Sequence, residues 1–129
     1  MSPKEIFTFY DAEHLLIANI ASPRSVRNIA AKPRVCVSFV DIFVQKGFKV
    51  LGVAQNLRKQ DKGYAKWVAP LNALAGPRFP ILSVIVIRVT ACEPINAPSY
   101  QLYPHETTLK AQTASAMRAY GVQPVGDRI

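Results

Sequence analysis

Residues 18–28 of the chain read ANIASPRSVRN, and they decide how the rest of the sequence is interpreted. They overlap the end of the almost wholly apolar run 14–20, which is typical of a buried strand. Ser22 stands where a helix N-cap belongs, and Pro23 stands at the first helical position, where its missing N–H is not needed. We therefore expect a buried strand, a short turn and a helix that begins at Pro23 and ends near Pro33.

The start of this predicted helix is a candidate anion site. A helix N-terminus presents unpaired backbone N–H groups and the positive end of a dipole. Arg24 and Arg27 add cationic side chains, and Ser22 and Ser25 add hydroxyl groups. This combination suits a phosphate group. The same residues also fit a capped surface helix with solvated arginines, and the local sequence does not separate the two interpretations.

Composition limits the class of protein. The chain has 129 residues, of which 50% are hydrophobic, so we expect one globular domain over residues 1–129. Its formal net charge of +8 suits a nucleic acid, a membrane surface or a phosphorylated small ligand. The basic residues are dispersed and no aromatic-rich strand alternates with them, which disfavours a nucleic-acid groove. No apolar run is long enough to span a bilayer and the N-terminus has no signal-peptide core, so we expect a cytoplasmic protein without membrane association.

Cysteine and histidine are sparse. Cys36 and Cys92 lie in apolar, strand-like runs, and we expect them to be buried free thiols. His14 and His105 are far apart in the sequence. We therefore predict neither a metal site nor a histidine-dependent triad.

The remaining pattern predicts five strands and two or three helices. Strands are expected at 5–10, 15–20, 35–40, 47–54 and 83–90, with 35–40 in the centre of the sheet. Helices are expected at 23–32 and 64–75, and a third at 105–120 within a helical C-terminal tail, residues 105–129. The short connections favour a small, mostly antiparallel β-barrel with helices on its outside.

Several single residues refine this pattern. Asp11 and Glu13 are interpreted as turn residues of a hairpin between the first two strands, not as a catalytic pair. Gly52 inside a strand indicates a bulge or a close backbone approach. Pro94 is expected to end the strand that precedes it. Trp67 would either stack near a cofactor or pack in a core or interface, and the second role is the more common one.

Three passages resemble the FMN-binding split-barrel family related to pyridoxamine 5'-phosphate oxidase. The first is SPKEIF at 2–7. The second is LLIAN at 15–19, followed by Ser22, Arg24, Ser25, NI at 28–29 and KPRV at 32–35. The third is the strand 48–54, which ends in LGVA. Their order and spacing cover roughly the first half of the chain. The family normally has a helix and a first strand before the first passage, whereas this chain begins directly at it. We therefore expect the first strand to be missing or replaced, which leaves an edge near 6–10 that needs covering.

The resemblance implies a six-stranded, antiparallel split barrel that forms a homodimer with FMN bound at the subunit interface. It implies that Arg24 and Ser25 hold the FMN phosphate, that Ser22 supports the turn, and that Lys4 lies near the phosphate or the flavin edge. It further implies that Asn19 lines the flavin ring and that Gln45 or Lys46 supplies another polar contact. It assigns no catalytic residue and no metal.

The resemblance also implies a flavin-dependent oxidoreductase that acts on a small-molecule substrate. Because a flavin carries its own redox chemistry, no acid–base dyad is required of the protein. Residues 121–129 lack the arginine-rich motif with which the oxidase members grip pyridoxal phosphate, so vitamin B6 oxidation is not supported. The alternatives are a non-catalytic flavin-, haem- or deazaflavin-binding module of the same fold and, less favoured, a basic nucleic-acid-binding β-barrel.

Overall fold

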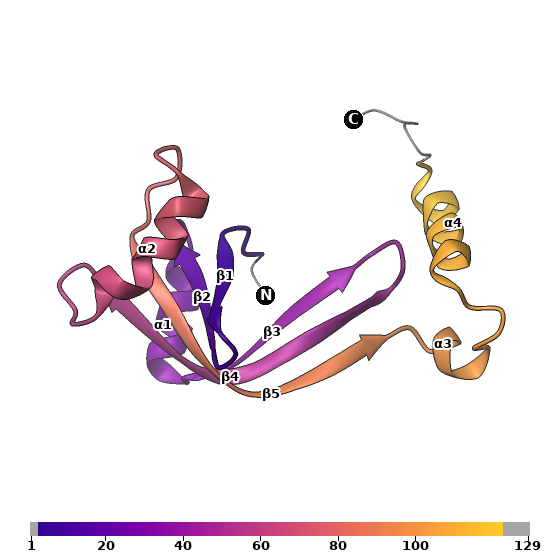
Figure 1. Cartoon of the computed structure of the whole chain (residues 1–129), viewed down its shortest axis with the longest axis horizontal. Coiled ribbons are helices and arrows are strands. Elements are labelled where there is room, and N and C mark those ends of the chain that lie inside the picture. The colour runs from indigo at the N-terminus through magenta and orange to yellow at the C-terminus, as the bar shows by residue number, and fades with distance from the viewer. Residues whose placement is uncertain (1–2, 123–129) are drawn as a thin grey trace. The chain divides into compact units, whose positions relative to one another are not determined.

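The computed structural model of the chain describes residues 3–122, which form five strands and four helices (Figure 1). Every strand and helix predicted from the sequence is present, and the short helix α3 is an addition. In chain order the elements are β1 (Phe7–Asp11), β2 (His14–Asn19), α1 (Pro23–Ala31), β3 (Arg34–Asp41), β4 (Lys46–Arg58), α2 (Tyr64–Ala75), β5 (Ser83–Asn96), α3 (Ser99–Leu102) and α4 (Leu109–Tyr120).

The strands form one sheet in the order β1-β2-β5-β4-β3, with β1 antiparallel to β2 and β2 antiparallel to β5. The described residues thus form an open, five-stranded sheet in a mixed α/β structure. The number of strands agrees with the five predicted from the sequence, whereas the mostly-β, closed barrel that we expected is not observed among the described residues. The prediction that strand 35–40 is central was also wrong, because β5 is central and β3 lies at an edge. The apolar run of β3 suggested burial on both faces, yet only alternate side chains, those of Val35, Val37 and Phe39, are half-buried.

The contacts within the chain divide the described residues into two compact units. The first unit comprises residues 3–37 and 50–92 and is built around β2. Leu15 and Ile17 on one face of β2 are buried, and so are Leu16 and Ala18 on the other. This explains why the run 14–20 is apolar throughout, since a strand covered on both faces has no solvent side.

Helix α2 covers one face of the sheet in the first unit (Figure 1). Val68 and Leu71 of this helix belong to one buried cluster with Leu16, Val84 and Val86 of the strands. These strand residues alternate along β2 and β5, as one face of a sheet requires. The helix ends at Gly76, whose φ of 67° suits glycine, as the sequence predicted.

Gly52 lies where β4 approaches β5 closely in the first unit. A Cβ atom at this position would stand 2.5 Å from Cγ2 of Ile87 and 2.6 Å from the carbonyl oxygen of Arg88. The predicted close backbone approach is therefore confirmed, because no side chain fits there. On the same face of β4, Val50 and Ala54 are buried.

The second unit comprises residues 38–49 and 93–122 within the described chain. Its strand segments meet at a turn in which Gln45 has a φ of 57°, and Phe39 and Phe48 stack with ring centroids 4.8 Å apart. Helix α4 begins at the side-chain cap of Thr108 and ends at Gly121. Ala116 is the one buried residue of this helix, in keeping with its weak apolar stripe.

Two further predictions need correction. Cys36 and Cys92 are free, as expected, but both are exposed rather than buried. Cys36 occupies an outward position of an edge strand, and Cys92 lies in β5 beyond Ile87, where continuous burial ends. Pro94 does not end its strand, since β5 continues to Asn96. Within residues 3–122, no helix has the length and apolar character needed to cross a membrane.

Candidate functional site

The candidate anion site is the N-terminus of α1, which has no side-chain cap. Ser22 is the N-cap residue and Pro23 follows it, as predicted, but the Ser22 side chain accepts no hydrogen bond from the helix. The N–H groups of Arg24 and Ser25 are thus not capped by Ser22. The first turn also contains no acidic residue that would neutralise the positive end of the helix dipole.

Lys4 and Ser25 meet at this helix start. The ammonium of Lys4 donates a hydrogen bond of 3.2 Å to Oγ of Ser25, across 21 residues of sequence. Burial lowers the pKa of the Lys4 ammonium below its ordinary value, because desolvation penalises the charged form. A negative group placed beside this ammonium would offset that penalty.

The arginines of α1 are free of ion pairs within the described residues. Arg24 and Arg27 are both exposed, and within residues 3–122 neither forms an ion pair. Arg24 lies on the first turn, beside Ser25, whereas Arg27 lies one turn further along. Arg24 is therefore the arginine whose charge adds to the field at the start of the helix.

Asn19 is buried, and its side chain and its backbone carbonyl form hydrogen bonds. Its side-chain Nδ2 donates to Oγ of Ser83 over 2.8 Å, and its Oδ1 accepts a hydrogen bond of 3.0 Å from the backbone N–H of Ser22. Its carbonyl oxygen accepts a third bond, from the N–H of Leu82. Asn19 thus joins the end of β2 to the start of α1 and to the segment that leads into β5. The resemblance implies that Asn19 lines a flavin ring, and that stays a prediction. These bonds show in addition that Asn19 positions the turn, a role that the sequence did not reveal.

Gln45 and Lys46 belong to the second unit, whereas the other five predicted site residues belong to the first. The carbonyl oxygen of Gln45 accepts a hydrogen bond from Ala97, and its side chain lies 3.4 Å from the Gln112 amide nitrogen. The ammonium of Lys46 lies 4.1 Å from the ring centroid of Tyr100, a cation–π arrangement. Within their own unit, both residues are therefore close to polar or aromatic partners.

A cavity of about 380 Å³ lies between α1 and β4, within the volume range of small-molecule sites. Val26 and Ile29 form part of its apolar wall, and Asn56 and Arg58 supply polar groups. Oδ1 of Asn56 is buried and has no hydrogen-bond partner within the described residues. None of the seven predicted site residues lines this cavity. This cavity was not predicted, because the predicted strand ended at residue 54 whereas β4 continues to Arg58.

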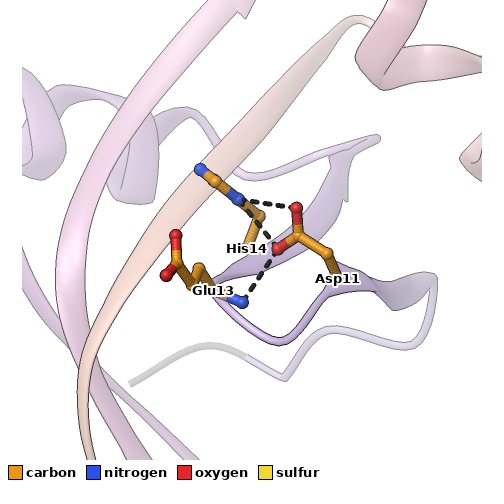
Figure 2. Close-up of polar contacts among 3 residues, drawn as sticks. All are labelled: Asp11, Glu13 and His14. Carbon is orange, nitrogen blue, oxygen red and sulfur yellow. Dashed lines mark hydrogen bonds and ion pairs between the residues drawn. The ribbon is translucent and has the colours of Figure 1, made fainter.

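The turn between β1 and β2 is organised by Asp11 (Figure 2). Its carboxylate accepts a hydrogen bond of 2.8 Å from the backbone N–H of Glu13 and lies 2.9 Å from Nδ1 of His14. The Glu13 N–H, followed by the His14 side chain, lowers the pKa of the Asp11 carboxyl. The hydrogen bonds to the ionised Asp11 carboxylate therefore stabilise the folded state above the ordinary carboxyl pKa. This contribution is lost as the pH falls through the lowered pKa of Asp11. The prediction that Asp11 and Glu13 are turn residues is confirmed.

No arrangement typical of a metal site occurs in residues 3–122, where no three or more His, Cys, Asp or Glu side chains gather to hold an ion. The chemistry available at the start of α1 is therefore that of donors and cations: backbone N–H groups, an ammonium and a hydroxyl. Such a set binds oxyanions.

Comparison with known proteins identifies the fold. No family model matches the chain, and no curated protein matches its sequence. Among solved structures, HupZ from Group A Streptococcus superimposes with a TM-score of 0.60 at 19% identity, covering 74% of this chain and 77% of HupZ. The chain has the fold of the FMN-binding split-barrel proteins. The resemblance found in the sequence is thus confirmed at the level of the fold.

Two further structures of this fold match. A provisionally assigned pyridoxamine 5'-phosphate oxidase from Lactobacillus delbrueckii gives a TM-score of 0.55 at 22% identity, covering 70% of this chain and 69% of that one. An FMN-binding protein from Syntrophomonas wolfei gives a TM-score of 0.56 at 12% identity, covering 73% and 66%. At these identities the likeness concerns the fold alone.

The bonds of Asn19 generate a prediction for stability. Replacing Asn19→Ala removes two side-chain hydrogen bonds and leaves the N–H of Ser22 and the hydroxyl of Ser83 without a partner. We expect the free energy of unfolding to fall by about 1–3 kcal/mol, measured by urea denaturation. Asn28→Ala, at an exposed position of α1, is the control and should change stability by less than about 0.5 kcal/mol. Equal stability of the two variants would contradict the positioning role.

Proposed function

We propose that this protein binds FMN through its phosphate at the start of α1 and acts as a flavin-dependent oxidoreductase on a small-molecule substrate. The observation that supports this most directly is the contact between Lys4 and Ser25 at an uncapped helix N-terminus. The shared fold with FMN-binding split-barrel proteins supports it independently.

The residues at this helix start fit a phosphate ester. The N–H groups of Arg24 and Ser25 supply donors, the hydroxyl of Ser25 supplies another, and Lys4 supplies a partly desolvated cation. A phosphate dianion bound there would receive charge-assisted hydrogen bonds, which are about twice as strong as neutral ones. Arg24 would close over the phosphate from the exposed side. When bound, FMN supplies the redox chemistry, and the protein supplies position and charge.

The other candidate residues have different parts in this proposal. Asn19 fixes the turn on which Ser22 and the helix start depend, so its effect on FMN acts through geometry. Gln45 and Lys46 remain candidates for a further polar contact with the flavin. Each already has a neighbour in the second unit, namely Gln112 and Tyr100, that would hold its side chain in place.

We further propose that two chains form a homodimer. Several large apolar side chains of the second unit are exposed to solvent. The most exposed are Leu102 at 69%, Tyr103 at 59%, Ile42 at 56%, Leu109 at 55%, and Val40 and Tyr120, both at 51%. Burial of such side chains against a second copy would remove them from water.

The first prediction from this proposal concerns the affinity for FMN. Removing the ammonium in Lys4→Met or the guanidinium in Arg24→Ala takes away a cation that faces the phosphate. Hydrogen bonds to charged groups are worth about 1.5–3 kcal/mol, so we expect Kd for FMN to rise about 10- to 100-fold in each variant. The quenching of flavin fluorescence on titration with protein measures this affinity.

Two controls define the contribution of the phosphate. Arg27→Ala, one turn further along α1, should leave the affinity for FMN unchanged. Riboflavin has the same ring without the phosphate, so its weaker binding should be equal in the wild-type protein and in Lys4→Met. If Lys4→Met and Arg24→Ala bind FMN as tightly as the wild-type protein, the phosphate is not held at α1.

A second prediction concerns the assembly. The purified chain, with a mass of 14.2 kDa, is expected to behave in light scattering as a particle of twice that mass. Replacing Ile42→Lys and Leu102→Lys together places charges among the exposed apolar side chains and should produce monomers. The exposed pair Leu74→Lys and Leu82→Lys in the first unit is the control and should leave the dimer intact. A wild-type monomer would refute the homodimer.

A third prediction separates an enzyme from a binding module. The FMN-loaded protein is expected to oxidise NADH or NADPH faster than the same concentration of free FMN, measured by the loss of absorbance at the nicotinamide band. Arg24→Ala should lose this activity at FMN concentrations that saturate only the wild-type protein, since it would carry less flavin. A rate no higher than that of free FMN, with tight FMN binding retained, would identify a non-catalytic module.

A further inference from the structure

A second cavity lies in the first unit, away from the start of α1. It measures about 250 Å³ and is lined by side chains of β2, β4, β5 and α2. Val53, Leu57 and Val86 form an apolar wall, the indole of Trp67 forms another side, and His14 and Arg88 supply the charged and polar groups. None of the residues proposed to hold FMN lines this cavity.

The sheet places the two polar residues side by side. His14 and Arg88 are direct cross-strand partners in the antiparallel pairing of β2 with β5. Side chains of directly opposite residues project from the same face of a sheet. Both therefore face the cavity from neighbouring strands, at the end of β2 nearest the turn organised by Asp11.

Asp11 fixes the orientation of the histidine ring. Nδ1 of His14 lies 2.9 Å and 3.1 Å from the two carboxylate oxygens of Asp11. In Figure 2 the second ring nitrogen, Nε2, lies on the side of the ring away from Asp11. Nε2 is thus the histidine atom left for another partner. The imidazole also lies near the indole of Trp67, with ring centroids 5.2 Å apart.

Cationic side chains lie at the cavity and beside its indole wall. Arg88 is exposed and forms no ion pair with any residue between 3 and 122. The ammonium of Lys66 lies 4.3 Å from the ring centroid of Trp67. Asp11 is the acidic group closest to His14, and it is already hydrogen-bonded to Glu13 and His14. An uncompensated guanidinium beside an apolar wall favours an anionic ligand with an apolar body.

We propose that this cavity binds a small aromatic carboxylate. The carboxylate accepts hydrogen bonds from the guanidinium of Arg88, beside the imidazole of His14. The ring of the ligand packs against Trp67 and the apolar wall formed by Val53, Leu57 and Val86. The volume equals the share of about eight water molecules in the liquid, which is enough for one aromatic ring.

The chain offers a direct reporter for this site, because Trp67 is its only tryptophan. We would titrate the full chain with benzoate and follow the tryptophan fluorescence, with isothermal calorimetry on the same samples as a reading that does not depend on the indole. Benzyl alcohol, which has the ring without the charge, and acetate, which has the charge without the ring, are the ligand controls. We expect saturable binding of benzoate with Kd near or below about 1 mM, and binding at least about tenfold weaker for both controls.

Variants test the contacts with the carboxylate. Arg88→Gln should weaken benzoate binding about tenfold or more, since it removes a charge-assisted pair. Arg78→Gln, an exposed arginine of the same unit that does not line the cavity, should bind benzoate like the wild-type protein. His14→Gln should weaken binding without unfolding the chain, as circular dichroism would verify.

Three results would overturn the proposal: no saturable heat or fluorescence change with benzoate, equal binding of benzyl alcohol, or unchanged binding in Arg88→Gln. Because the FMN residues at α1 do not line this cavity, the outcome is independent of whether FMN binds. The titration is therefore made with the flavin-free and with the FMN-supplemented protein, and the same affinity is expected in both.

Discussion

The candidate phosphate site depends on a single buried amide. Asn19 stands at the end of a strand that is covered on both faces, so its polar atoms need partners within the protein. It finds them in the N–H of Ser22 and the hydroxyl of Ser83, which come from two segments far apart in the sequence. The start of α1 is thereby anchored to the sheet and not merely connected to it by a loop. This anchoring leaves Ser22 at the N-cap position, while its own side chain takes no part in capping.

The sequence predicted the local structure well because its strongest signals are steric or solvent-driven. The apolar run at 14–20 required burial on both faces, Pro23 marked the first turn of α1, and Gly52 marked a close approach of β5. Each of these signals depends on neighbours in sequence or on the absence of a side chain. Such constraints act whatever the tertiary arrangement, so one sequence is enough to detect them.

Long-range arrangement was less predictable. The apolar residues at 35–40 are compatible with a central strand and with an edge strand. Whether the second face of this strand is buried depends on segments that are distant in the sequence. The prediction that Cys36 is buried was wrong for the same reason, because it assumed that β3 is covered on both faces. The contact between Lys4 and Ser25 joins residues 21 positions apart, and the bond between Asn19 and Ser83 joins residues 64 positions apart. Among the candidate site residues, the helix-start pattern identified Ser25 and the family resemblance added Lys4, while the cavity residues beyond position 54 carried no motif.

The two exposed thiols have a practical consequence for work with this protein. Cys36 lies on an edge strand and Cys92 lies in the part of β5 beyond its buried segment, and neither is paired in a disulfide. Accessible thiols oxidise in air and can join separate chains covalently. An apparent dimer prepared without a reductant could therefore be a cross-linked artefact, and a gel run without reducing agent would reveal it. The same accessibility makes Cys36 and Cys92 natural attachment points for maleimide dyes or spin labels.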